Sequence, residues 1–135
     1  MGMSRSIKSV DLTTIYRDLE LFSQELGQMV DRCPKSLSWQ HDASRALSLI
    51  DEAIDLYCAA YITPNNTEEK RRLLTVAYSA LLRTYTLLSR IYQRSRQGAH
   101  VLTDAQFGRM SERIYLLKAQ LTGFINKTCK PTDPA

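Results

Sequence analysis

Apolar residues recur at intervals of three and four along most of this chain, and this spacing constrains the fold more than any other feature. In each of four segments it places the apolar side chains on one side of a helix. Pro34 and the turn-forming residues at 63–66 and 97–100 separate the segments, because proline and such residues interrupt helices. No segment shows the alternation typical of a strand. We therefore predict an all-α fold, an antiparallel up-down-up-down four-helix bundle.

The predicted helices cover residues 12–32, 36–61, 67–94 and 103–127, and the second could instead start at Ser38. Asp11 is the expected N-cap of the first helix. Asn66, with Glu69 three residues on, resembles a capping box for the third, and Thr103 with Gln106 does the same for the fourth. We expect one domain over residues 11–127, a flexible N-terminus at 1–10 and a flexible tail at 128–135.

The composition favours a cytoplasmic protein. No apolar run approaches the roughly 18 residues that a membrane-spanning helix needs, and the first residues lack the hydrophobic run of a secretory signal. The three cysteines, Cys33, Cys58 and Cys129, are an odd number and lie far apart. Such cysteines are typical of reduced thiols rather than of a disulfide framework.

The stretch from Lys70 to Thr103 contains seven basic residues and no acid. At about 100° per residue, its arginines gather in a stripe roughly 40° wide on the third predicted helix: Arg72, Arg83, Arg90 and Arg94. Solvated helix faces usually pair acids with bases, so this face indicates an acidic or polyanionic partner. Residues 1–62 carry a net charge of −3 and residues 63–135 carry +7. The same asymmetry could instead hold two halves of one bundle together.

The second predicted helix has two apolar stripes about 100° apart. A helix in a monomeric bundle needs only one, so the second stripe is predicted to be an interface between copies of this chain. Its residues are Ala46, Leu49, Ala53, Leu56 and Ala60. The alternative is that this helix lies deep in the bundle and contacts both of its neighbours.

Catalytic and metal-binding patterns are weak. His41 and His100 lie far apart, and neither has a Cys, Asp or Glu partner at the spacing of a metal site. No paired Glu-x-x-His motif, phosphate-binding glycine loop or nucleophile elbow occurs. We expect no enzymatic activity, no metal and no cofactor.

Two aromatic residues are candidates for an external contact. Tyr115 lies off the apolar stripe of the fourth predicted helix, and Trp39 lies beside the turn at Pro34. Five of the other tyrosines fall on core arcs, where packing is their expected role: Tyr16, Tyr57, Tyr78, Tyr85 and Tyr92.

Four sequence features occur in an informative order. Pro34-Lys35 precedes the second helix and residues 69–74 (Glu-Lys-Arg-Arg-Leu-Leu) open the third, which continues with Leu-Leu-Arg at 81–83 and Leu-Ser-Arg at 88–90. The last helix runs from Leu-Thr-Asp-Ala-Gln-Phe at 102–107 to Gly-Phe-Ile-Asn-Lys at 123–127. Together with the length, these resemble the accessory variability determinant (Avd) proteins of diversity-generating retroelements. Those proteins belong to a wider four-helix-bundle superfamily that includes proteins encoded in intervening sequences of 23S ribosomal RNA genes. In place of the tryptophan that is usual near the end of that pattern, this chain has Phe124.

The resemblance implies a basic, barrel-shaped homopentamer that binds a reverse transcriptase and its template RNA, and possibly DNA, in support of mutagenic cDNA synthesis. It implies phosphate contacts by the arginines of the third helix, with two on the fourth as second choices: Arg71, Arg72, Arg83, Arg90 and Arg94, then Arg109 and Arg113. The predicted interface on the second helix would join the subunits.

Two other classes of function stay open. In the first, the chain is a protein–protein adaptor of the same superfamily, and its arginines pair with an acidic patch on another protein. In the second, the basic side lies against anionic lipid. The second is disfavoured because no helix is expected to combine a basic arc with exposed bulky apolar residues, and we expect no membrane partner.

Overall fold

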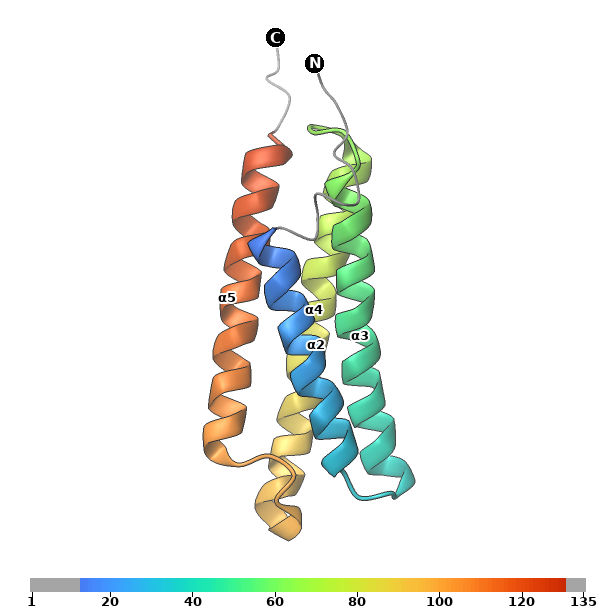
Figure 1. Ribbon diagram of the computed structural model, residues 1–135, viewed down its shortest axis with the longest axis vertical. Coiled ribbons are helices and arrows are strands. Elements are labelled where there is room, and N and C mark those ends of the chain that lie inside the picture. Colours follow the sequence, from blue (N-terminus) through green and yellow to red (C-terminus); the bar gives the residue numbers. More distant parts are fainter. Residues whose placement is uncertain (1–12, 131–135) are drawn as a thin grey trace.

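The computed structural model describes residues 13–130, which form four α-helices and contain no strand. The helices lie side by side along the long axis of the molecule (Figure 1). They are α2 (Thr14–Arg32), α3 (Leu37–Tyr61), α4 (Glu68–Arg94) and α5 (Asp104–Thr128), with a short π-type turn, η1 (Ser95–Ala99), after α4. The predicted all-α class is confirmed. The predicted flexible N-terminus at 1–10 lies outside the described residues.

Hydroxyl side chains begin three of the four helices. Thr13 Oγ1 accepts a hydrogen bond from the Tyr16 N–H, so α2 begins two residues later than an Asp11 cap would place it. Asp11 itself lies outside the described residues. At α5 the predicted capping box is present: Thr103 Oγ1 accepts from the Gln106 N–H, and the Gln106 side chain accepts from the Thr103 N–H. These bonds satisfy backbone donors that have no partner within the helix.

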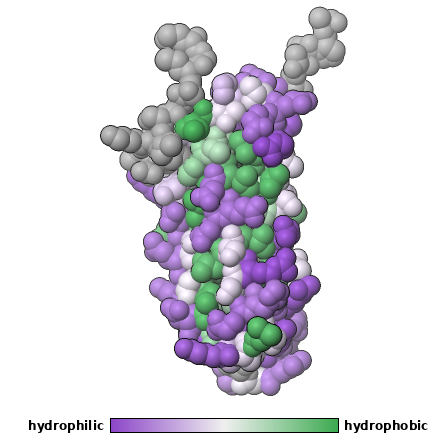
Figure 2. All heavy atoms as spheres, turned by 90° about the vertical axis from the view of Figure 1, so that its right-hand side faces the viewer, coloured by the Kyte–Doolittle hydropathy of each residue, from purple (hydrophilic) through white to green (hydrophobic). Residues whose placement is uncertain are grey.

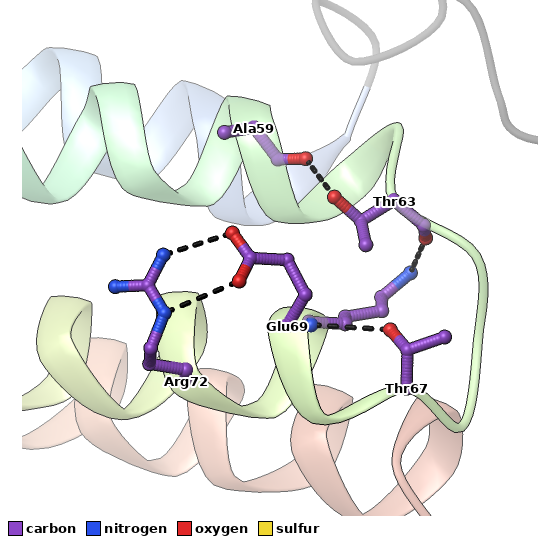
Figure 3. Close-up of polar contacts among 6 residues, drawn as sticks. Ala59, Thr63, Thr67, Glu69 and Arg72 are labelled. Atoms are coloured by element: carbon purple, nitrogen blue, oxygen red, sulfur yellow. Dashed lines mark hydrogen bonds and ion pairs between the residues drawn. The ribbon is translucent and has the colours of Figure 1, made fainter.

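The start of α4 differs from the prediction by one residue. Thr67 is the N-cap, and its Oγ1 accepts from the Lys70 N–H (Figure 3). Asn66 instead adopts a left-handed conformation with φ 61°, which asparagine tolerates better than most residues. Its N–H donates to Thr128 O (2.7 Å), and its Oδ1 accepts from the Lys130 N–H (2.9 Å). Asn66 therefore joins the α3–α4 turn to the end of α5.

This junction also corrects the predicted boundary of the tail. Helix α5 continues to Thr128, and both Thr128 and Cys129 are buried. Residues 128–130 thus belong to the folded part, because the Asn66 bonds and a hydrogen bond from Arg71 to Cys129 O hold them against the α3–α4 turn. The rest of the predicted tail, residues 131–135, lies outside the described residues.

The connection from α4 to α5 requires a reversal within a few residues. Gly98 has φ 117°, a conformation that side chains rarely adopt, and His100 follows with φ 54°. Ser95 stabilises the reversal: its Oγ donates to Ile91 O (2.9 Å) and accepts from the Leu102 N–H (3.0 Å). The α2–α3 connection lies at the same end of the molecule, and the α3–α4 connection lies at the opposite end (Figure 1).

The contact between α3 and α4 is the most extensive in the molecule, and that between α2 and α5 is among the least. Both helices carry small side chains that are fully or almost fully buried: Ala43, Ala46, Ala53 and Ala60 on α3, and Ala77 and Ala80 on α4. Alanine lets two helix backbones approach closely, which increases the number of atoms in van der Waals contact.

Burial within the chain corrects the predicted oligomer interface on α3. Ala46, Ala53 and Ala60 are 0% exposed and Leu49 is 6% exposed, so only Leu56 of the five predicted residues keeps a partly exposed side chain. Both apolar stripes of α3 are therefore mostly buried within this chain. This agrees with the alternative interpretation, in which the helix lies deep in the bundle. Figure 2 looks onto the side that α3 occupies, and there apolar residues form only an interrupted band between hydrophilic ones.

Candidate nucleic-acid interface

The outward face of α4 carries the predicted arginine stripe. Arg72, Arg83 and Arg90 are exposed, whereas Leu74 and Leu81 on the inner side are fully buried. At 1.5 Å per residue the three arginines extend over roughly 27 Å of the helix. No acid occurs between Glu69 and Asp104, so this surface is positive along most of its length.

Arg83 and Arg90 form the free centre of the stripe. Both are exposed, and neither makes a hydrogen bond or ion pair with any residue of the described range 13–130. An unpaired guanidinium offers five N–H donors in a fixed planar arrangement that matches a phosphate group. These two arginines can therefore bind a phosphate without first losing a bond within the protein.

Arg72 is already paired at the surface. Its Nη2 and Nε donate to the two carboxylate oxygens of Glu69 at 2.8 and 3.2 Å (Figure 3). The hydrogen bond from Arg72 lowers the pKa of the Glu69 carboxyl, and the same bond raises the pKa of the guanidinium. Because both side chains are more than half exposed, the pair is weak. A phosphate can compete for Arg72, but less readily than for an unpaired arginine.

Lys70 and Arg71 serve the fold at the start of α4. Lys70 is 2% exposed; its Nζ donates to Thr63 O (3.1 Å) and to Asn65 Oδ1 (2.8 Å) and lies 5.2 Å from the centre of the Phe124 ring. Arg71 Nη2 donates to Cys129 O. A cation near the last carbonyls of a helix also offsets the negative end of the helix dipole. Arg71, a predicted phosphate contact, thus has a structural partner in α5.

Arg94 is held at the opposite end of α4. Its Nη2 lies 3.3 Å from Asp42 Oδ2, and its guanidinium lies 5.5 Å from the centre of the Trp39 ring. Asp42 is 5% exposed, so the acid is buried with the arginine as its cation. The pair and the ring fasten the start of α3 to the end of α4. Arg94 and Trp39, both predicted to be available for external contacts, are therefore engaged with each other and with Asp42.

We expect Asp42→Ala to lower the free energy of unfolding by about 1–3 kcal/mol, because it leaves the Arg94 guanidinium partly buried without its acid. Urea denaturation followed by circular dichroism measures this change. Glu69→Ala is the matched control, since it removes the acid of an exposed pair and is expected to leave stability unchanged. Equal free energies of unfolding for the two variants would show that the Asp42–Arg94 pair does not stabilise the fold.

The two second-choice arginines lie on α5 and differ in their surroundings. Arg113 Nη2 lies 2.6 Å from Glu25 Oε1 on α2, and its buried Nε has no hydrogen-bond partner in the described part of the chain. Arg109 is exposed, forms no ion pair with a described residue, and lines a small surface hollow together with Glu25 and Arg32. Arg113 therefore joins α5 to α2, and Arg109 is free.

One exposed arginine was missed by the sequence analysis. Arg45 lies on α3, three residues after Asp42, and Arg90 lies four residues before Arg94. The Asp42–Arg94 pair fixes the two helices relative to each other, and α3 leaves that end of the bundle while α4 approaches it (Figure 1). Arg45 and Arg90 are consequently at about the same level, one turn from the pair. Periodicity placed Arg45 on the polar arc of α3, but only the helix packing brings it to the level of Arg90.

The histidines lie apart from this surface. His41 is exposed and lines an open hollow of about 630 Å³ at the start of α3, and His100 is exposed after η1. Over residues 13–130, no group of three or more His, Cys, Asp and Glu side chains is placed to hold a metal ion. Cys33 and Cys129 are buried and Cys58 is partly buried, and burial raises the pKa of the Cys33 thiol.

The chain was compared with known proteins. No family model, no curated protein and no solved structure matches it. No helix within residues 13–130 combines the length and the apolar character needed to cross a bilayer. Within the described residues, the outward face of α4 carries two unpaired arginines, Arg83 and Arg90, and Arg45 is exposed on the neighbouring helix α3. The unpaired Arg109 lies apart from them, in the hollow between α5 and α2.

Proposed function

We propose that this chain is a non-enzymatic accessory protein that binds RNA through the outward face of α4. The observation that carries the proposal is that Arg83 and Arg90 pair with none of the residues 13–130, on a stretch without acids from Lys70 to Thr103. A face that only needed solubility would gain from acids between its bases. Arginine contacts to phosphate position a nucleic acid but do not select its sequence. Binding to RNA is thus expected to depend on salt more than on sequence.

The resemblance to accessory variability determinant proteins extends this proposal. On that basis we propose that the chain is cytoplasmic and binds RNA largely independently of sequence. In this proposal it also contacts a reverse transcriptase and supports mutagenic cDNA synthesis, with DNA as a further ligand. The antiparallel up-down-up-down bundle belongs to the same proposal. It is supported by contacts between helix ends: Tyr57 Oη with Thr13 Oγ1 (3.1 Å), and Gln120 Nε2 with Asp18 Oδ2 (2.9 Å).

Association of copies, as a homopentamer, also remains a proposal, but the buried stripe on α3 cannot support it. The charge distribution offers a different basis. Helices α2 and α3, which are neighbours, carry eight acids and three bases, whereas α4 and α5 carry four acids and ten bases. One side of the bundle is therefore acidic and the other basic. Copies arranged head to tail would bring unlike sides together, and such an interface generates a ring when the rotation closes.

The adaptor function is favoured by a different observation. Leu21 on α2 is 49% exposed and Leu116 on α5 is 53% exposed. Both lie between the Asp18–Gln120 hydrogen bond and the Glu25–Arg113 ion pair, which places them opposite each other across the α2–α5 contact. Adjacent exposed leucines with a polar rim are typical of a protein-binding surface. This surface could bind a protein with no nucleic acid present.

A salt series tests the proposed function. The affinity of the wild-type chain for a structured RNA is measured at several salt concentrations, and the mass of the protein is checked in each buffer. We expect the affinity to fall with a log–log slope that corresponds to about four phosphates or more. Absent binding, or binding that salt does not weaken, would contradict the proposal and leave the adaptor function.

A further inference from the structure

A row of aromatic rings runs along α4 parallel to the arginine stripe. Tyr78, Tyr85 and Tyr92 are seven residues apart, a spacing of nearly two full turns, so they share one side of the helix. They lie against α5, where Phe107 stacks on Tyr92 (ring centres 4.3 Å apart) and contacts Tyr85 (6.0 Å). Tyr115 lies further along α5 on the same side of the bundle. We call these five residues the aromatic row.

Cations flank the aromatic row at both ends. Lys118 Nζ lies 6.0 Å from the centre of the Tyr78 ring, and the Arg96 guanidinium lies 5.9 Å from that of Tyr92. A hydrogen bond from the Tyr92 hydroxyl to Asp104 (2.6 Å) raises the pKa of the phenol, which therefore stays neutral at physiological pH. The row thus combines ring faces with positive charge, and Asp104 at its edge is occupied by Tyr92.

Two of the rings are open to solvent. Tyr115 is 67% exposed and Tyr85 is 42% exposed, with Leu82 beside them at 43%. The sequence analysis placed Tyr85 on a core arc, and the structure corrects this: Tyr85 lies at the edge of that arc, where α5 covers it only in part. The Tyr78–Lys118 and Tyr85–Phe107 contacts align α4 with α5, so Tyr115 lies roughly 6 Å along the axis from Tyr85.

Uncharged hydroxyl side chains separate the aromatic row from the arginine stripe. Thr75, Ser79 and Thr86 are all exposed and lie between the two rows on the outward face of α4. Arg83 and Leu82 are about 100° apart around the helix, and Arg83 and Tyr85 about 160°. The outward face of α4 is thus positive along one edge and aromatic along the other, with no acid between.

We propose that α4 binds single-stranded RNA lengthwise, with phosphates on the side of Arg83 and Arg90 and unpaired bases stacked on Tyr85 and Tyr115. The inference rests on the proposed function and adds the form of RNA that this surface takes. Tyrosine rings bind bases through their faces, and only an unpaired strand offers base faces for stacking. A duplex could reach the arginines but would leave the rings without a partner. Hydroxyl side chains lie between the two rows on α4 and acids do not, and both facts favour a nucleic acid here over a protein.

The test compares two probes on one pair of variants. Single-stranded oligouridine and the duplex of the same length formed with oligoadenosine are titrated into wild type and into Tyr85→Ala with Tyr115→Ala. We expect the double variant to bind oligouridine about tenfold more weakly or worse, with duplex binding unchanged. The matched control, Tyr85→Phe with Tyr115→Phe, keeps both rings and should bind oligouridine as wild type does. Tyr115→Ala alone gives a second measurement on a ring that contacts no other described ring, should the double variant fold poorly.

The outcomes separate the inference from the proposed function. Salt-dependent binding of both probes by wild type, with no loss in the alanine variants, would overturn the stacking role and assign the aromatic row to a protein partner, while the proposed function stands. An equal loss for oligouridine and duplex would also overturn it, because base faces would not be what the rings recognise. If wild type binds neither probe, the proposed function itself fails.

Discussion

Arg83→Glu together with Arg90→Glu is expected to abolish binding of RNA while the helical content stays unchanged. Both side chains are exposed and unpaired with any described residue, so their reversal breaks no bond within the fold. It replaces two phosphate contacts by two repulsive charges at the centre of the stripe. We expect a loss of affinity on the order of a hundredfold or more at low salt. The slope of log affinity against log salt concentration should fall by the equivalent of about two phosphate contacts. Fluorescence anisotropy with a labelled RNA measures both quantities.

A change of net charge alone must be excluded as the cause. Arg17→Glu with Lys35→Glu alters the formal charge by the same amount, from +4 to 0, at exposed positions outside α4. Arg17 lies in the first turn of α2 and Lys35 just before α3, where an acid suits the helix dipole. This control should keep most of the RNA affinity. Equal losses of RNA affinity in the two variants would mean that RNA does not bind at the arginine stripe in particular. Unfolding of the Arg83→Glu, Arg90→Glu variant would mean that these arginines stabilise the fold.

Leu49→Asp is expected to unfold most of the protein. The Leu49 side chain is 6% exposed and belongs to the hydrophobic core, so an aspartate there must either be buried as a charge or force the helices apart. We expect a loss of more than about 4 kcal/mol, a large part of the stability of a typical domain. Thermal and urea denaturation followed by circular dichroism measure the loss.

Leu116→Asp is the matched control, with the same residue types at a site on α5 that is 53% exposed. It should change the free energy of unfolding by less than about 1 kcal/mol. If copies associate through the α2–α5 side, it should also lower the mass measured by light scattering. A stable Leu49→Asp protein with reduced mass would instead restore the predicted interface on α3 and contradict its burial within one chain.

The helices and most of their ends could be predicted from local sequence. Thr103 and Gln106 form a capping box because the two partners are three residues apart, and Pro34 ends α2 because it cannot continue a helix. The start of α4 was less certain, since Asn66 and Thr67 can both cap a helix. Thr67 takes the role because Asn66 is held by Thr128 and Lys130, which are distant in sequence.

The sequence was enough to predict a basic surface on α4, but not which arginines belong to it. The acid-free run marked α4 as the basic helix, and helical geometry alone placed Arg83 and Arg90 outside. Which other arginines are free depends on partners from other helices: Asp42 holds Arg94, Glu25 holds Arg113, and the end of α5 holds Arg71. These partners are between about fifty and ninety residues away in no fixed pattern, so no local rule could identify them.

The sequence by itself determined four amphipathic helices, their turns and the charge contrast between the two halves, because these follow from residue spacing and composition within single segments. The tertiary structure alone decided that the second stripe of α3 is core, that Tyr85 is exposed, and that Arg45 and Arg90 lie at about the same level of the bundle. The physical reason is that an apolar stripe specifies burial but not the surface that buries it. Alanines on α3 and α4 allow a close approach of these two helices, and that approach assigns each remaining side chain to the core or to solvent.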